Sequence, residues 1–97
     1  MKIKITGIGT EITKSVHERS KISAAIYNAN QAIKYAKYCL KNHKLLKDEA
    51  WKELGLNNLH GQYRLLLDTE SLAEKYSALW GEKFYKCKLD CEKLLSK

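Results

Sequence analysis

The chain has no proline in its 97 residues. Proline is the residue that most reliably breaks a helix, so its absence permits long uninterrupted helices. Spacing then predicts where they lie, because residues seven apart from Ile12 are mostly large and apolar and those three further on are mostly small, as in a helical seam. The first set is Ile12, Arg19, Ile26, Ile33, Leu40, Lys47 and Leu54, and the second is Ser15, Ile22, Ala29, Ala36, His43 and Ala50.

The ends of this seam predict the bounds of the first helix. The helix starts near Thr10, a residue type that caps helix N-termini. It ends just before Gly55, because glycine is typical of the position after a helix C-terminus. We therefore predict a first helix over residues 10–54, either continuous or broken near Asn42 and His43. Residues 1–9 are predicted to form an extended arm.

The second half of the chain predicts a return helix. Residues 55–61 contain two glycines and two asparagines, which favour a reversal of the chain. A second amphipathic helix over residues 62–96 is predicted from apolar residues at three- and four-residue steps, namely Leu65, Leu72, Tyr76, Trp80 or Leu79, Phe84, Cys87, Cys91 and Leu94. The predicted fold class is all-α, a single domain over residues 1–97 built as an antiparallel two-helix hairpin. The alternative is a four-helix bundle with a break near residues 68–71, where Ser71 and Glu74 have capping-box spacing.

Two helices bury one stripe each and leave other apolar residues on their flanks. These residues are Trp51, Tyr63, Leu66, Leu67, Tyr85 and Leu95. We therefore expect the hairpin to pair with helices of another protein or of a second copy.

Positive charge is concentrated in the first helix. Residues 19–47 hold seven basic residues and no acidic one, which equals the whole net charge of +7. Lys34, Lys37, Lys41 and Lys44 share a side with two tyrosines, which makes this stripe a solvated face, a docking surface for an acidic protein or a nucleic-acid site. Two arginines and the lack of a recognition module argue against nucleic acid. The candidate partner-binding residues are Tyr27, Lys34, Tyr38, Lys41, Trp51 and Trp80.

No set of residues predicts catalysis, a metal site or a cofactor. Cys87 and Cys91 have a spacing that can bind one metal, but the predicted hairpin keeps Cys39 away from them, and two ligands are too few for a structural site. The three histidines are far apart in sequence and have no motif partner. We expect a non-enzymatic protein without cofactor.

The first residues of the chain and its apolar stretches indicate where the protein is located. A basic start is not followed by the apolar run of a signal peptide, and no apolar stretch approaches the length of a membrane helix. An odd number of cysteines, three, favours reduced thiols. We expect a cytoplasmic protein without a membrane span, or one exported with a partner by a non-Sec route.

Leu59, His60 and Gly61 lie in the predicted reversal of this proline-free hairpin. In this respect residues 10–97 resemble the WXG/LXG superfamily of type VII secretion, whose small helical hairpins carry such a triplet at the turn and pair with another helical protein. The resemblance implies an adaptor or chaperone that holds the helical targeting domain of an LXG toxin during export. The secretion tail of the family is an aromatic residue followed four residues later by an acid, and it is not matched after Phe84 or Tyr85. This departure implies that the chain itself carries no secretion signal and acts as an adaptor or chaperone for the toxin.

Two other classes fit the same size, charge and helicity. One is a self-contained helical-bundle immunity protein, and the other is a basic nucleic-acid-binding or inhibitor protein. The break near residues 68–71 discriminates between the adaptor and the immunity protein, because two long helices favour the adaptor and several short ones favour the self-contained bundle.

Overall fold

The structure, a computed structural model, describes residues 8–96, with side-chain environments from residue 13 on. This part of the chain is made of helices without strands: α1 (Ile8–Leu46), α2 (Glu49–Asp68), α3 (Glu70–Lys75) and α4 (Ser77–Leu95). The all-α fold class is thereby confirmed. Most of the predicted extended arm lies outside the described residues, but Ile8 and Gly9 already belong to α1.

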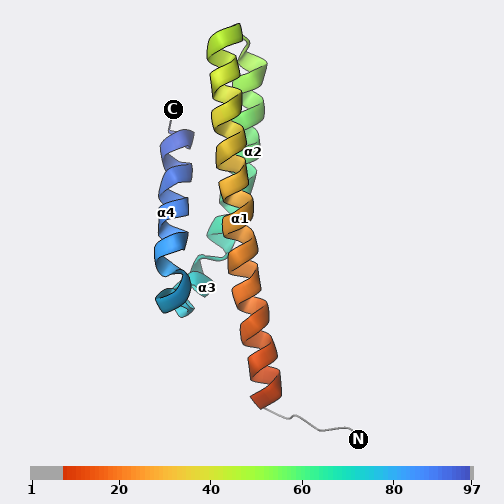
Figure 1. Cartoon of the computed structure of the whole chain (residues 1–97), viewed down its shortest axis with the longest axis vertical. Helices are drawn as coiled ribbons and strands as arrows, with labels where there is room; N and C mark the ends of the chain where they lie inside the picture. Colours follow the sequence, from red (N-terminus) through yellow and green to blue (C-terminus); the bar gives the residue numbers. More distant parts are fainter. Residues whose placement is uncertain (1–7, 97) are drawn as a thin grey trace, which may run out of the picture.

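The helices form an elongated body of 65 × 27 × 15 Å. In Figure 1, α1 runs along most of the length, α2 returns beside it, and α4 lies along the middle of this pair, with α3 as a short connector. Both ends of α1, together with the start of α2, extend beyond α4. Three long helices therefore pack together only in the middle of the molecule.

The chain reverses at Lys47 and Asp48, so the predictions of a first helix to residue 54 and a turn at residues 55–61 are wrong. Lys47 has a left-handed φ of 55° and its N–H donates to the carbonyl of His43 at 2.7 Å, which ends α1. Asp48 then caps α2, because its carboxylate accepts a hydrogen bond from the N–H of Ala50 at 3.0 Å. The left-handed backbone of Lys47 and the cap at Asp48 therefore separate α1 from α2.

The glycines assigned to the turn lie within α2. A Cβ on Gly55 would be 2.6 Å from the Cβ of Cys39 on α1, so this glycine permits a close approach of two helices. The predicted turn motif of Leu59, His60 and Gly61 is also helical, with Leu59 buried and the other two exposed. The motif is therefore not in a turn, and of its three residues only Leu59 belongs to the core.

The predicted second helix over residues 62–96 is broken, and the alternative break near residues 68–71 is confirmed at Thr69. The hydroxyl of Thr69 donates to the carbonyl of Leu66 at 2.8 Å, and the chain breaks again at Tyr76. These two breaks turn α4 back onto the hairpin. The capping box does not start α3, since Thr69 and not Ser71 is its N-cap.

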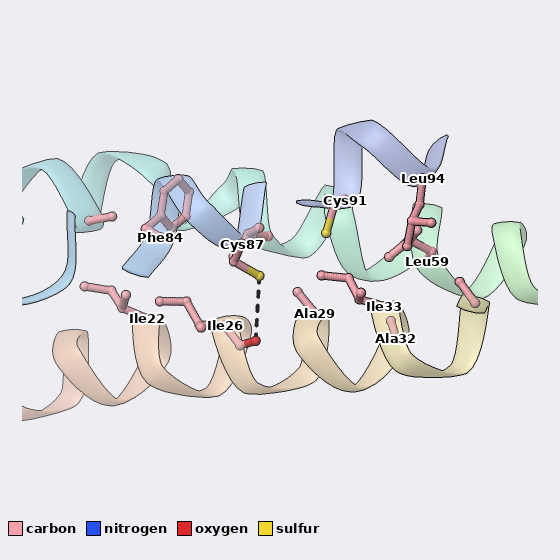
Figure 2. Close-up of a cluster of buried hydrophobic side chains, with 13 residues drawn as sticks. Ile22, Ile26, Ala29, Ala32, Ile33, Leu59, Phe84, Cys87, Cys91 and Leu94 are labelled. Atoms are coloured by element: carbon pink, nitrogen blue, oxygen red, sulfur yellow. Dashed lines mark hydrogen bonds between the residues drawn. The ribbon is translucent and has the colours of Figure 1, made fainter. Parts of the chain in front are cut away.

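The core lies where α4 covers the hairpin. Figure 2 shows Ile22, Ile26 and Ile33 of α1 facing side chains of α4, with Leu59 contributed by α2. Leu66 is buried and Leu65 is 54% exposed, contrary to the prediction, because Leu66 is seven residues after Leu59 and so shares its face. The α4 side chains in this core are Phe84, Cys87, Cys91 and Leu94.

Candidate protein-binding site

An aromatic cluster joins α1 and α2 in the half of the hairpin that lies nearer its closed end. Tyr38 of α1 contacts Trp51 of α2 edge to face at 6.0 Å between ring centroids, and Tyr35 stacks on Tyr38 at 6.5 Å. Tyr38 is 56% exposed and Tyr35 38% exposed. We call these three residues the tip cluster. Tyrosine and tryptophan are enriched in protein interfaces, and here two exposed tyrosine rings pack with the partly buried ring of Trp51.

Two of the predicted lysines flank the tip cluster. Lys34 and Lys41 are exposed and lie four residues before and three residues after Tyr38, which places them on the same side of α1. Tyr27 is 63% exposed but lies seven residues before Lys34, outside the cluster. Spacing along α1 and the ring contact thus bring together four of the six predicted partner-binding residues, namely Lys34, Tyr38, Lys41 and Trp51.

Trp80 belongs to a different surface. It lines a hollow of about 550 Å³ between the first part of α1 and the start of α4, and Lys83 lies over its ring at 5.4 Å from the centroid. The other lining residues are Val16, Arg19, Ser20, Ser23 and Leu79. These residues were not predicted from the sequence, because the misplaced turn puts the two halves of the chain in the wrong register.

A second hollow of about 520 Å³ lies at the other end of α4. Its lining residues are Lys37 of α1 and Asp90, Lys93, Leu94 and Ser96 at the end of the chain. The spacing of Leu79, Lys83, Lys86, Asp90 and Lys93 by four and three residues was a sequence signal for one face of α4. Both hollows therefore border the junction of α1 with α4.

Glu18 fastens the start of α4 to α1. Its carboxylate accepts hydrogen bonds from the Nζ of Lys75 at 3.1 Å and from the hydroxyl of Tyr76 at 3.0 Å. The bond from Lys75, followed by that from Tyr76, lowers the pKa of Glu18 against the opposing effect of burial. This contact links the junction of α3 and α4 to α1.

The cysteines are buried and serve packing. The thiol of Cys87 donates weakly to the carbonyl of Ile26 at 3.9 Å (Figure 2), and a hydrogen bond with Cys87 together with burial raises the pKa of Cys91. No group of three or more metal-binding side chains occurs in the part of the chain that the structure describes. His43 has a structural contact in the turn between α1 and α2, where its Nδ1 lies 3.0 Å from the carbonyl oxygen of Asp48.

Among residues 8–96, no helix combines the length and apolar character needed to cross a membrane. No known protein family, no curated protein and no protein of known structure matches the chain. Function is therefore inferred from the surfaces described above.

Proposed function

We propose that the protein is a non-enzymatic helical adaptor that binds a helical segment of another protein. The observation that carries this proposal is the tip cluster, where the exposed ring of Tyr38 contacts the partly buried ring of Trp51 edge to face across α1 and α2. The rings of Tyr35 and Tyr38 are exposed, so packing of the core does not explain why aromatic residues lie here. Lys34 and Lys41 beside it favour an acidic partner.

The partner that the family resemblance implies is the helical targeting domain of a type VII secretion toxin of the LXG class. Size and helicity support this identification, whereas the division of the second half of the chain into α2, α3 and α4 counts against it. Leu59, His60 and Gly61 give it no support, because they lie within α2. The secretion partner is thus the finer part of the proposal, and the adaptor role does not depend on it.

The adaptor role is tested by affinity capture from the native host with the tagged full chain. We expect a stoichiometric complex with one helical protein. The identification of a type VII secretion partner further requires that the captured protein contain an LXG-type targeting domain. Trp51→Ala is expected to speed dissociation, while Leu65→Ala, which removes an exposed apolar side chain elsewhere on α2, leaves it unchanged. A folded monomer that captures no protein would refute the adaptor role.

Charge at the same surface is tested through the association rate. Lys41→Glu is expected to slow association and to reduce its dependence on salt, because long-range attraction acts on the encounter of the partners. Lys21→Glu makes the same change of charge on α1 outside the tip cluster and serves as the control. Equal effects of both substitutions would mean that only the net charge matters.

A second candidate is a self-contained helical-bundle protein of the immunity class. It is favoured by the breaks at Thr69 and Tyr76, which fold α4 back over Ile22, Ile26 and Ile33 and cover the hairpin from within the chain. This candidate predicts a monomer that unfolds in one cooperative step without any partner. The salt dependence of RNA or DNA binding tests the third class, a nucleic-acid-binding protein.

A further inference from the structure

The three faces between the long helices of the bundle differ in charge. The hollow between α1 and α2 has no charged lining residue and consists of Asn28, Gln31, Ala32, Tyr35, Asn58 and Gln62. The face beside α4 toward α2 and α3 is bridged, since Tyr63 donates to Glu92 at 2.6 Å and Lys88 donates to Glu70 at 2.9 Å. The hollow on one face therefore has no charged lining residue, and on the other face Lys88 is paired with Glu70 within the chain.

The α1–α4 face, defined by the two hollows along that junction, is basic. Its lining residues include one acid, Asp90, and four cations: Arg19, Lys37, Lys83 and Lys93. Lys86 lies three residues after Lys83 and four before Asp90, which places it on the same side of α4. Two helices thus contribute positive charge to both sides of one junction.

One end of the α1–α4 face is also apolar. Val16 is 49% exposed and Leu79 is 61% exposed, and both line the same hollow as the half-buried ring of Trp80. Covering these side chains would remove apolar surface from water at about 25 cal/mol per Å². The surface therefore combines an apolar contact at one end with cations along its length.

We propose that the α1–α4 face binds an acidic amphipathic helix of the partner protein, laid lengthwise along α4. The proposal rests on the adaptor function and names a second contact surface for it. The lining residues of the two hollows range from Leu79 to Ser96, which at 1.5 Å per residue is about 25 Å and matches a helix of about 17 residues. An apolar side chain of that helix fills the hollow at Trp80, and its carboxylates lie near Arg19, Lys83, Lys37 and Lys93.

A helix suits this face better than a nucleic acid does. The ridges of two neighbouring helices form a channel that accepts a third helix, as in a four-helix bundle. A phosphate backbone would leave Val16 and Leu79 in water, whereas an apolar side chain covers them. Of the four cations lining the hollows only Arg19 is an arginine, the residue that holds phosphate in a bidentate manner.

The test uses the full chain and two synthetic helical peptides with leucines at one face. The remaining positions are mainly glutamate in the first peptide and glutamine in the second. The chain has two tryptophans, Trp80 on the α1–α4 face and Trp51 in the tip cluster, so two indole N–H signals in an NMR spectrum report which surface is occupied. We expect the acidic peptide to shift the signal of Trp80 and to bind at least about tenfold more tightly than the neutral peptide.

Substitutions test the cations directly. Arg19→Gln combined with Lys83→Gln is expected to weaken binding of the acidic peptide by about tenfold. Lys14→Gln combined with Lys21→Gln removes the same charge from exposed positions that line neither hollow, and we expect a change of less than about threefold. Circular dichroism of both double variants verifies that the helices are retained.

The outcomes separate this inference from the adaptor function. A shift of the Trp51 signal alone would overturn the inference and leave the tip cluster as the binding surface. Equal binding of the two peptides, or no binding of the acidic one, would also overturn it. So would a single-stranded oligonucleotide that binds more tightly than the acidic peptide and shifts the signal of Trp80.

Discussion

Gly55 of α2 lies so close to Cys39 of α1 that a Cβ on residue 55 would be 2.6 Å from the Cβ of Cys39. The Cα of Ala36 would be 3.2 Å away, so the backbone of α1 as well as a side chain limits the space. This contact explains why a residue of poor helix propensity lies inside a helix. Because Gly55 lies inside α2 and against α1, the chain must reverse before it, at residues 47–48 and not at residues 55–61.

Gly55→Ala is expected to lower the free energy of unfolding by about 1–3 kcal/mol, because the added methyl group forces α1 and α2 apart. Gly61→Ala is the control. A Cβ at residue 61 meets nothing within 4 Å, so alanine is expected to raise the free energy of unfolding by about 0.5–1 kcal/mol through its helix propensity. Urea denaturation measures both changes. A loss of stability in Gly61→Ala would contradict a helical Gly61 and support a turn at residues 55–61.

Periodicity was sufficient to predict the helical fold and most of the core, including Phe84, Cys87, Cys91 and Leu94 of α4. Ile22, Ile26 and Ile33 are buried as the seven-residue spacing predicts, because side chains on one face of a helix share one environment. The turn was misplaced because Ala50 and Leu54 continue the same spacing across Lys47 and Asp48. A spacing rule cannot distinguish one helix from two helices that happen to stay in phase.

For the candidate surfaces, spacing predicts which residues share a side of one helix, but it does not predict which helices meet. Lys34, Tyr38 and Lys41 share one exposed side of α1, as their spacing predicts, because they lie on one helix. The contact of Tyr38 with Trp51 and the hollow at Trp80 depend on where the chain reverses, which is a tertiary property. The contact of Gly55 with Cys39 has no local signal either, because a glycine between helices and a glycine in a turn look alike in sequence.

Lys47→Gly is expected to raise the free energy of unfolding by about 0.5–1 kcal/mol. Lys47 has a φ of 55°, where a residue with a Cβ is strained and glycine is not. Lys44→Gly provides the control, because Lys44 lies in the last turn of α1 and glycine there should lower the free energy of unfolding by a similar amount. Opposite signs in thermal or urea denaturation support the turn at residues 47–48, and two losses of stability contradict it.

Removal of metal ions is expected to leave the melting temperature unchanged. Cys87 and Cys91 lie in the apolar core, and residues 8–96 contain no group of three or more metal-binding side chains. Calorimetry with and without a chelator measures this. Unfolding by the chelator, or zinc that copurifies at one equivalent per chain, would show that these thiols bind metal.

The contact of Glu18 with Lys75 and Tyr76 predicts a pH dependence of stability. Hydrogen bonds from these two residues lower the pKa of Glu18 below its ordinary value of 4.5 in the folded state. The unfolded chain therefore binds a proton at higher pH than the folded chain does. The stability that Glu18 contributes is fully present above pH 4.5 and is lost as the pH falls through the lower folded pKa.

Glu18→Gln is therefore expected to lower the melting temperature at pH 7 and to have a smaller effect at pH 3, where the wild-type carboxylate is increasingly protonated. The loss should be concentrated at the start of α4, since Glu18 joins this region to α1. Amide hydrogen exchange at residues 76–80 measures that local effect. Glu53→Gln, at an exposed position of α2, is the control. If the difference between wild type and Glu18→Gln is the same at both pH values, the carboxylate does not hold α4 in place.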